Sequence, residues 1–241
     1  MNKLSKKYSK LLILISIALV FITIPVKAAV RNQPNSSQTK IDRTHLALWS
    51  ELMRRLGRRR RNGGSRGPTC LIAPQRLDDP ISKVEINEEV WSLNPLFLWN
   101  IEDGEATKIE LFEKGRSQAL WSKEIPKGAT SIVYDGEPLK PGNSYEWQIV
   151  AKAPFEMKSI SAKFKMMESQ KRFPITIRLA LLENNLKQQG ADAEKIALEK
   201  ANYLAQKQLW SDVVGEIYKV KNPSIELRRK KQQLQSSEFC N

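Results

Sequence analysis

Hydrophobic side chains recur at every second position in three segments between Cys70 and Met167. These segments are 108–111, 145–149 and 159–166, and the positions between their apolar residues are polar or charged. A period of two is typical of antiparallel strands with one buried and one solvated face. Glycine-containing turn pairs such as Asp103-Gly104 punctuate the region. We therefore expect an antiparallel β-sandwich at residues 70–168, with the apolar run 96–99 as a candidate central strand.

One segment of this region, residues 139–149, carries a more specific signal. Pro141 and Gly142 form a turn pair, and Tyr145 follows at the start of an alternating strand. In immunoglobulin-like sandwiches a tyrosine near the start of the penultimate strand turns its hydroxyl back onto the preceding loop. The segment resembles that tyrosine corner of fibronectin type III domains. The alternative is an ordinary turn before an ordinary strand.

Trp99 and Trp147 are expected to fill the space between the sheets.

Beyond Phe173-Pro174 the apolar spacing becomes helical, and we assign residues 173–236 to a helical region. The expected helices are a segment ended by Gly190, segments 196–205 and 209–218, and a charged segment, 224–235. The first has Ile177, Ala180 and Leu181 with Leu186 as its candidate apolar face. The second and third resemble one tetratricopeptide-type hairpin. A single such unit cannot cover its own apolar face, so it must pack on neighbouring helices, on the sandwich or on a partner. The fold expected overall is mainly β with an α-helical appendage.

The first 28 residues have the three parts of a secretory signal peptide. Four lysines precede position 11, an uncharged apolar run follows at 11–26, and small residues come at Ala28 and Ala29. The run has 16 residues, whereas a membrane-spanning helix needs ~20. We expect cleavage after Ala28 and an extracytoplasmic location, either periplasmic or secreted to the cell surface. The alternative is an uncleaved anchor, which is the only membrane contact that we expect.

Residues 29–69 are expected to form a disordered leader that contains a short helix and ends in an Arg/Gly-rich linker. The helix is predicted from the spacing of Leu46, Trp49, Leu52, Met53 and Leu56. Residues 237–241 form a short tail.

The net charge of +14 is concentrated in two segments. Removal of the signal peptide with its five lysines leaves +9, and seven arginines between positions 54 and 66 account for most of that remainder. The cluster Arg58, Arg59, Arg60 and Arg61 suits contact with an anionic envelope polymer or lipid headgroups, or it is a solvated spacer. Nucleic acid is disfavoured as a partner because the cluster lacks interleaved aromatic residues that could stack on bases.

Cys70 and Cys240 are the two cysteines of the chain. An oxidising compartment permits one disulfide between them without demanding it, and the alternative is an unpaired cysteine near a mobile end. His45 is the single histidine, so the spacing of a His/Cys zinc site is missing. We expect no metal and no cofactor.

Catalytic signatures are also missing from the sequence. The acid pairs Asp78-Asp79, Glu88-Glu89 and Glu102-Asp103 are adjacent in sequence, and neighbouring side chains on a strand point to opposite faces. We interpret them as solvated loop residues and His45 as surface decoration. An unrecognised hydrolase would require clustered acids in a cleft.

Aromatic residues supply the remaining candidate for binding. Trp91 and Trp121 lie outside strongly alternating runs, so they are candidates for exposure as a sugar-stacking platform. The alternative is that they belong to the core, as tryptophans in related sandwiches do.

The chain is similar to the cyanobacterial domain of unknown function 928 family over roughly residues 58–223. The resemblance rests on the Arg-rich stretch that runs into 63–70, on the segment Asn94 to Trp99, on the segment Leu139 to Trp147 and on the helical tail. It implies an exported sandwich with a helical appendage and no assigned activity or ligand. Members often have a further cysteine late in the sandwich, and here the other cysteine is Cys240.

These features favour a non-catalytic, exported interaction module of the cell envelope that binds a protein partner. The alternative is an envelope glycan-binding module that uses Trp91 or Trp121.

Overall fold

The computed structural model describes residues 47–54, 69–75, 77–78, 85–86, 89–101, 104–152 and 157–236. All of them belong to one compact unit, residues 36–241. The predicted signal peptide, Arg58–Arg61, His45 and Cys240 lie outside the described residues.

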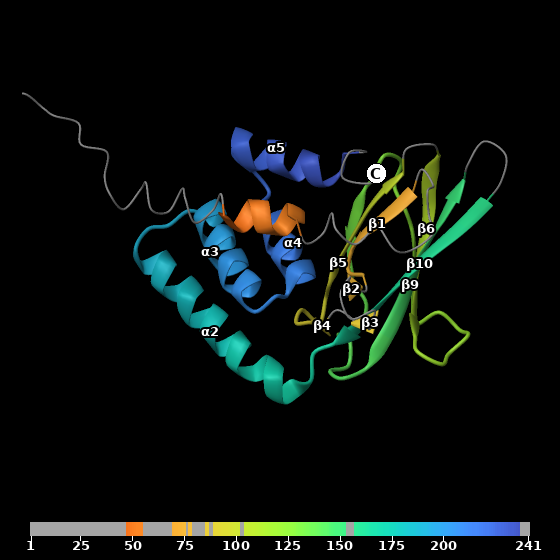
Figure 1. The fold of residues 1–241 in the computed structure, drawn as a ribbon, viewed down its shortest axis with the longest axis horizontal. Coiled ribbons are helices and arrows are strands. Elements are labelled where there is room, and N and C mark those ends of the chain that lie inside the picture. Colours follow the sequence, from red (N-terminus) through yellow and green to blue (C-terminus); the bar gives the residue numbers. More distant parts are fainter. Residues whose placement is uncertain are drawn as a thin grey trace, which may run out of the picture. The chain divides into compact units, whose positions relative to one another are not determined.

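Two larger β-sheets and one two-stranded sheet form the middle of the chain, and helices follow them (Figure 1). The strands are β1 (Thr69–Ala73), β2 (Leu77–Asp78), β3 (Glu85–Ile86), β4 (Glu89–Val90), β5 (Leu96–Ile101), β6 (Glu105–Glu113), β7 (Trp121–Glu124), β8 (Ser131–Val133), β9 (Ser144–Lys152) and β10 (Met157–Met166). The three-stranded sheet has the order β1-β5-β8, the five-stranded sheet has the order β4-β10-β9-β6-β7, and β2 pairs with β3. The predicted β-rich region followed by helices is confirmed. The expected antiparallel pairing is confirmed for the alternating segments in β6, β9 and β10, whereas the short strand β4 pairs with β10 in parallel.

The alternating segments lie in β6, β9 and β10, and their inward side chains share a core with the three-stranded sheet. Ile109, Trp147 and Phe164 from the five-stranded sheet are buried together with Phe97 and Trp99 of β5. The rings of Phe97 and Trp147 lie 4.9 Å apart. The indole N–H of Trp147 donates a hydrogen bond to the Pro74 carbonyl, which satisfies the polar atom that its burial would otherwise strand.

Strand β5 is the middle strand of its sheet and is buried on both faces. Phe97 and Trp99 point into the core between the sheets, whereas Leu96 and Leu98 belong to a second core shared with the helices. Burial on both faces explains why residues 96–99 form a continuous apolar run rather than an alternating one. The prediction of a central strand is confirmed.

The loop before β9 has the predicted tyrosine geometry. Gly142 has φ +83°, a conformation that favours glycine, and it follows Pro141 in a turn closed by a bond of 3.3 Å from the Asn143 N–H to the Lys140 carbonyl. The Lys140 N–H then donates to the Tyr145 hydroxyl at 3.0 Å. The expected hydrogen bond from the loop to Tyr145 is therefore present.

Four helices follow the sheets: α2 (Ser169–Gln188), α3 (Ala193–Gln206), α4 (Trp210–Tyr218) and α5 (Ile225–Leu234). The side chains of Asp192 and Ser224 cap α3 and α5 by accepting from backbone N–H groups. Gly190, with φ +73°, follows α2. Helix α2 packs on α3, α3 packs on α4, and α4 contacts β5 (Figure 1). The predicted α3, α4 and α5 are confirmed.

Two details of the helical region differ from expectation. Helix α2 begins at Ser169 and contains Pro174, so the expected boundary after Phe173-Pro174 is wrong. Residues 47–54 form the predicted short helix, but Leu48 and Leu52 are buried in the core of α3 and α4. This part of the expected disordered leader is thus a component of the folded unit.

Candidate interaction surface

Helix α2 carries apolar side chains on two opposite faces. Ile175, Leu179 and Leu186 are buried, and Ile175 and Leu179 belong to the core shared with α3 and α4. On the other face, Phe173, Ile177 and Leu181 are 67%, 44% and 58% exposed. Residues four positions apart lie on the same side of a helix. These three side chains therefore form one continuous row, which we call the α2 stripe.

The α2 stripe is the largest alignment of strongly exposed apolar side chains in the part of the chain that the structure describes. The other large hydrophobic residues with comparable exposure, Leu120, Val133 and Ile225, lie on separate elements. Isolated exposed apolar residues are ordinary in soluble proteins. The outermost helix of a stack, in contrast, normally turns a polar face to solvent.

Basic residues border the α2 stripe. The helix contains Lys171, Arg172, Arg178 and Lys187 and one acidic residue, Glu183. Glu183 is half-buried and bound by Lys187 at 2.7 Å and by Lys200 of α3 at 3.0 Å. Hydrogen bonds from these two lysines lower the pKa of Glu183 to about 2. Lys171 and Lys187 are themselves paired with Glu89 and Glu183, so Arg178 is the exposed cation beside the apolar row that has no ion pair with a described residue.

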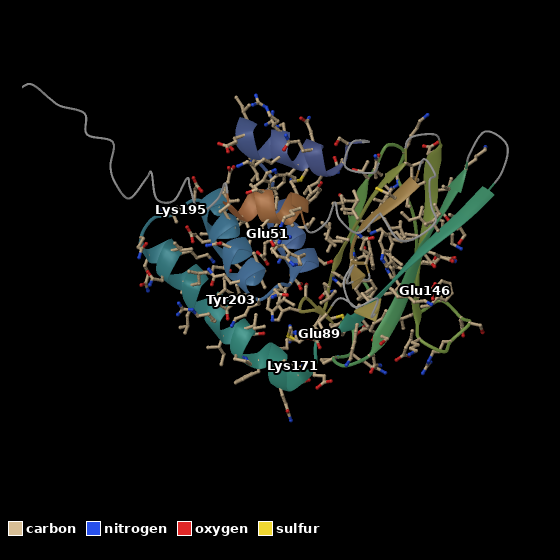
Figure 2. The ribbon with its side chains drawn as sticks, viewed as in Figure 1. Glu51, Glu89, Glu146, Lys171, Lys195 and Tyr203 are labelled. Atoms are coloured by element: carbon tan, nitrogen blue, oxygen red, sulfur yellow. The ribbon has the colours of Figure 1, made fainter. Side chains whose placement is uncertain are left out.

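The N-terminal half of α2 is fixed to the sheets through Trp91. The Arg172 Nε–H donates to the Trp91 carbonyl at 2.8 Å, and its guanidinium lies 5.4 Å from the centre of the Trp91 ring. The Trp91 indole N–H donates to the Thr176 hydroxyl at 3.1 Å. Lys171 forms an ion pair with Glu89 of β4 at 3.1 Å (Figure 2). These contacts hold α2 in one orientation on the folded unit.

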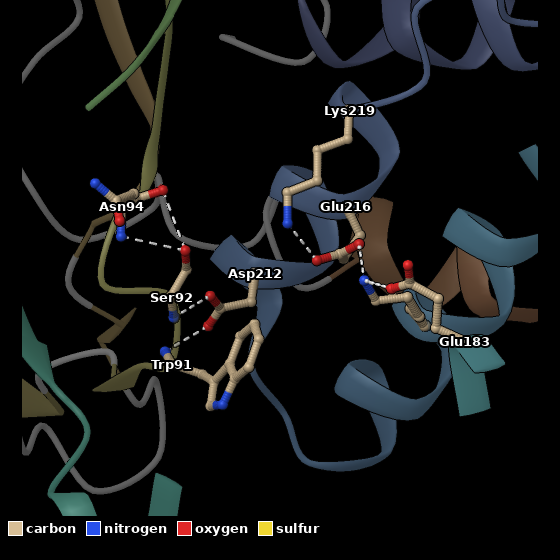
Figure 3. Close-up of polar contacts among 8 residues, drawn as sticks. Trp91, Ser92, Asn94, Glu183, Asp212, Glu216 and Lys219 are labelled. Atoms are coloured by element: carbon tan, nitrogen blue, oxygen red, sulfur yellow. Dashed lines mark hydrogen bonds and ion pairs between the residues drawn. The ribbon is translucent and has the colours of Figure 1, made fainter. Parts of the chain in front are cut away.

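Helix α4 binds the same connection from its other side. One oxygen of the Asp212 carboxylate accepts from the Trp91 N–H at 2.7 Å, and the other accepts from the Ser92 N–H at 2.8 Å (Figure 3). Asp212 is almost fully buried, so these charge-assisted bonds lie in a region of low dielectric and are strong. The residues that join β4 to β5 are therefore clamped between α2 and α4.

Trp91, a candidate for exposure as a sugar-stacking residue, is only partly exposed. Its ring is half-buried against the helical core, and both its polar edge and its face are occupied by Thr176 and Arg172. The pattern around Trp91 could not show this, because its partners lie 81 to 121 residues later in the chain.

Trp121, the second candidate for exposure, is also only partly exposed. Its ring is half-buried, 5.9 Å from the ring of Phe97 and 5.2 Å from that of Tyr134. Its indole N–H donates to Asp135 at 2.9 Å. Trp121 thus closes the edge of the core between the sheets, which is the alternative that the sequence left open.

A chain of ion pairs centred on the buried Glu216 links α2, α3 and α4. Glu216 of α4 is 3% exposed and contacts Lys200 at 3.2 Å and Lys219 at 2.6 Å (Figure 3). Burial acts to lower the pKa of Lys200, but Glu216 and Glu183 raise it on balance. Each carboxylate of this cluster forms ion pairs with lysines. We therefore interpret the cluster as stabilising the packing of the three helices. Among the described residues, no group of three or more His, Cys, Asp or Glu side chains could hold a metal ion.

The remaining sequence candidates are placed as follows. Cys70 is disulfide-bonded, and the chain has one other cysteine, Cys240. The arginine cluster 58–61 and His45 lie outside the described residues, as do Asp79, Glu88 and the pair Glu102-Asp103.

Sequence reasoning missed the α2 stripe as a surface, although its residues were noticed. Ile177 and Leu181 were expected to form the apolar face of their helix together with Leu186, but Leu186 is buried whereas Ile177 and Leu181 are exposed. Ile175 and Leu179 form a second apolar row in the same segment. The presence of two apolar rows on different faces of one helix is the sequence signal that could have indicated a second contact surface.

In the described part of the chain, no helix is both long enough and apolar enough to cross a membrane. No protein-family model matches the chain, and no curated protein or solved structure matches it.

Proposed function

We propose that this protein is an exported, non-catalytic interaction module of the cell envelope, and that a partner protein docks on the α2 stripe. The observation that carries the proposal is the row of Phe173, Ile177 and Leu181, exposed on a helix whose opposite face is buried. Leaving such a row in water costs roughly 25 cal/mol for each Å² of apolar surface. A partner that covers the row recovers this free energy.

The rigidity of the platform supports docking. Arg172, Thr176 and Lys171 all bind residues of the sheet region, so α2 keeps its orientation without a partner. A surface that is ordered in advance loses little conformational entropy on binding.

The fold family is also part of the proposal. We assign the two sheets to an immunoglobulin- or fibronectin-III-like sandwich, with Tyr145 as its tyrosine corner and Trp99 and Trp147 as its core tryptophans. The hydrogen bond from Lys140 to Tyr145 supports this assignment. We place the chain in the domain of unknown function 928 family on the sequence features described above.

The extracytoplasmic location rests on the signal-peptide pattern of residues 1–28. The disulfide at Cys70 agrees with it, because structural disulfides persist in oxidising compartments. Contact of Arg58–Arg61 with an anionic envelope polymer remains a separate prediction.

Co-purification with a pair of matched variants tests the docking surface. The full-length protein, processed as its source cells process it, is isolated after mild crosslinking as the wild type, as Ile177→Asp and as Ile225→Asp. Ile225 is 75% exposed and lies on α5, away from the α2 stripe. We expect a discrete partner protein with the wild type and with Ile225→Asp, and its loss with Ile177→Asp. Recovery of the wild-type protein alone would refute the proposal.

A further inference from the structure

The layered order of the helices points to the shape of the partner. Helix α3 lies between α2 and α4, and α4 lies between α3 and β5 (Figure 1). Helix α2 ends this series, yet it has apolar rows on both faces, as a helix inside a stack does. In stacked helical proteins the terminal helix needs a polar outer face to be soluble on its own. The exposed face of α2 therefore has the apolar composition of a face that packs against another helix.

The dimensions of the α2 stripe suit another helix. Phe173 and Leu181 are eight residues apart, which corresponds to about 12 Å along the helix axis. Spacing at every fourth residue forms a ridge that packs into the groove of a second helix. About two to three turns of an amphipathic helix would cover this row, because one turn rises about 5.4 Å.

The charges beside the α2 stripe indicate which charged residues the partner helix carries. Basic residues border the row, and the single carboxylate of α2 is held by Lys187 and Lys200. Arg178 is exposed and forms no ion pair with any residue that the structure describes. A second copy of this chain would bring like charges together, which disfavours self-association. A carboxylate beside the partner's apolar row would instead meet Arg178, whose charge has no ion-pair partner among the described residues.

We infer that the partner presents an amphipathic α-helix with acidic flanks, which lies along the α2 stripe and extends the helix stack by one layer. This inference rests on the proposed function and adds the form and charge of what docks there. Carboxylates of the docked helix pair with Arg178, and its apolar row covers Phe173, Ile177 and Leu181.

Designed peptides test the inference directly. Two labelled helical peptides share one apolar row with leucines at every fourth position, and they differ only in whether glutamate or lysine flanks the row. Fluorescence anisotropy with the full-length protein measures their binding. We expect the glutamate peptide to bind about tenfold more tightly than the lysine peptide, because a few exposed ion pairs of modest strength act together. Added salt should narrow this difference.

Variants of α2 test whether the peptides bind at the α2 stripe. Ile177→Asp should abolish binding of the glutamate peptide, and Ile225→Asp should leave it unchanged. Arg178→Glu should reduce the preference for the glutamate peptide by about threefold, since it replaces an attraction with a repulsion. Equal binding of the two peptides, or no binding of either, would overturn the inference.

A lipid surface is tested in the same experiment with vesicles of phosphatidylglycerol and of phosphatidylcholine. Binding to the anionic vesicles that is lost in Ile177→Asp, without binding of either peptide, would also overturn the inference and assign the surface to membrane contact. If Ile177→Asp removes the co-purifying partner of the previous section while the peptides show no charge preference, the docking function stands and only the acidic helix is wrong.

Discussion

The backbone N–H of Trp91 donates a 2.7 Å hydrogen bond to the carboxylate of Asp212, a residue 121 positions later in the chain. The neighbouring Ser92 N–H donates to the second oxygen of the same carboxylate. Two consecutive amides and one buried acid thus join the strands to the helices. These two hydrogen bonds join the connection between β4 and β5 to α4. The same connection also binds α2 through Trp91.

Replacement of Asp212 by asparagine should therefore destabilise the whole unit. Asparagine keeps one acceptor oxygen but turns an NH₂ group toward a backbone N–H, which leaves a buried donor unsatisfied. We expect the free energy of unfolding to fall by about 2–3 kcal/mol in urea titrations. Asp135→Asn, at an exposed ion pair with Lys123, keeps an amide oxygen that can accept from the Trp121 indole and should cost less than about 1 kcal/mol. Equal losses in the two variants would contradict the assigned role of Asp212.

The hydroxyl of Tyr145 provides a second stability test. Tyr145→Phe removes the acceptor for the Lys140 N–H and keeps the ring in the core. We expect a loss of about 1 kcal/mol in the free energy of unfolding. The matched variant Tyr203→Phe, whose hydroxyl has no hydrogen bond to a described residue, should change it by less than about 0.5 kcal/mol. A neutral Tyr145→Phe would show that the bond does not stabilise the loop.

The sheets and helices were predictable where local pattern and burial agree. Alternation identified β6, β9 and β10, and the apolar run 96–99 identified a strand with two buried faces. Helical spacing identified α3 and α4. In each case the residues that pack together are close in sequence or share one period.

Long-range contacts decided the features that sequence reasoning missed. Trp91 gives no periodic signal because it lies in a connection between strands, and its environment is made by Thr176, Arg172 and Asp212. In α2, the row of Ile175 and Leu179 is the one that is buried against residues of α3 and α4. Periodicity identifies that such rows exist but contains no information about which one a neighbour covers.

The two faces of α2 should respond very differently to truncation. Leu179, at 2% exposure, packs in the core, so Leu179→Ala should lower the free energy of unfolding by about 2–4 kcal/mol. Ile177→Ala, two residues away on the exposed face, should change it by less than about 1 kcal/mol. Thermal or urea denaturation of both variants measures the contrast. A large decrease in the free energy of unfolding for Ile177→Ala would mean that this side chain stabilises the fold, and would contradict its assignment to a docking surface.

Acid titration should reveal the contribution of Glu183. Its pKa is lowered from 4.5 to about 2 in the folded chain by hydrogen bonds from Lys187 and Lys200. A carboxylate with a lowered folded-state pKa contributes stability that is fully present above pH 4.5 and is lost as the pH falls toward 2. Glu183→Gln should be less stable than the wild type at neutral pH, and the difference should shrink across this window. A difference that does not change with pH would contradict the ion-pair assignment.

Site-specific photocrosslinking from the α2 stripe tests the central claim most directly. A photoreactive phenylalanine analogue is placed at Leu181 or, as the control, at Ile225, both of which are exposed, and the protein is irradiated in its source cells. We predict a discrete crosslinked adduct with one partner protein from position 181 and no such adduct from position 225. Absence of an adduct from position 181, or the same adducts from both positions, would contradict docking on α2.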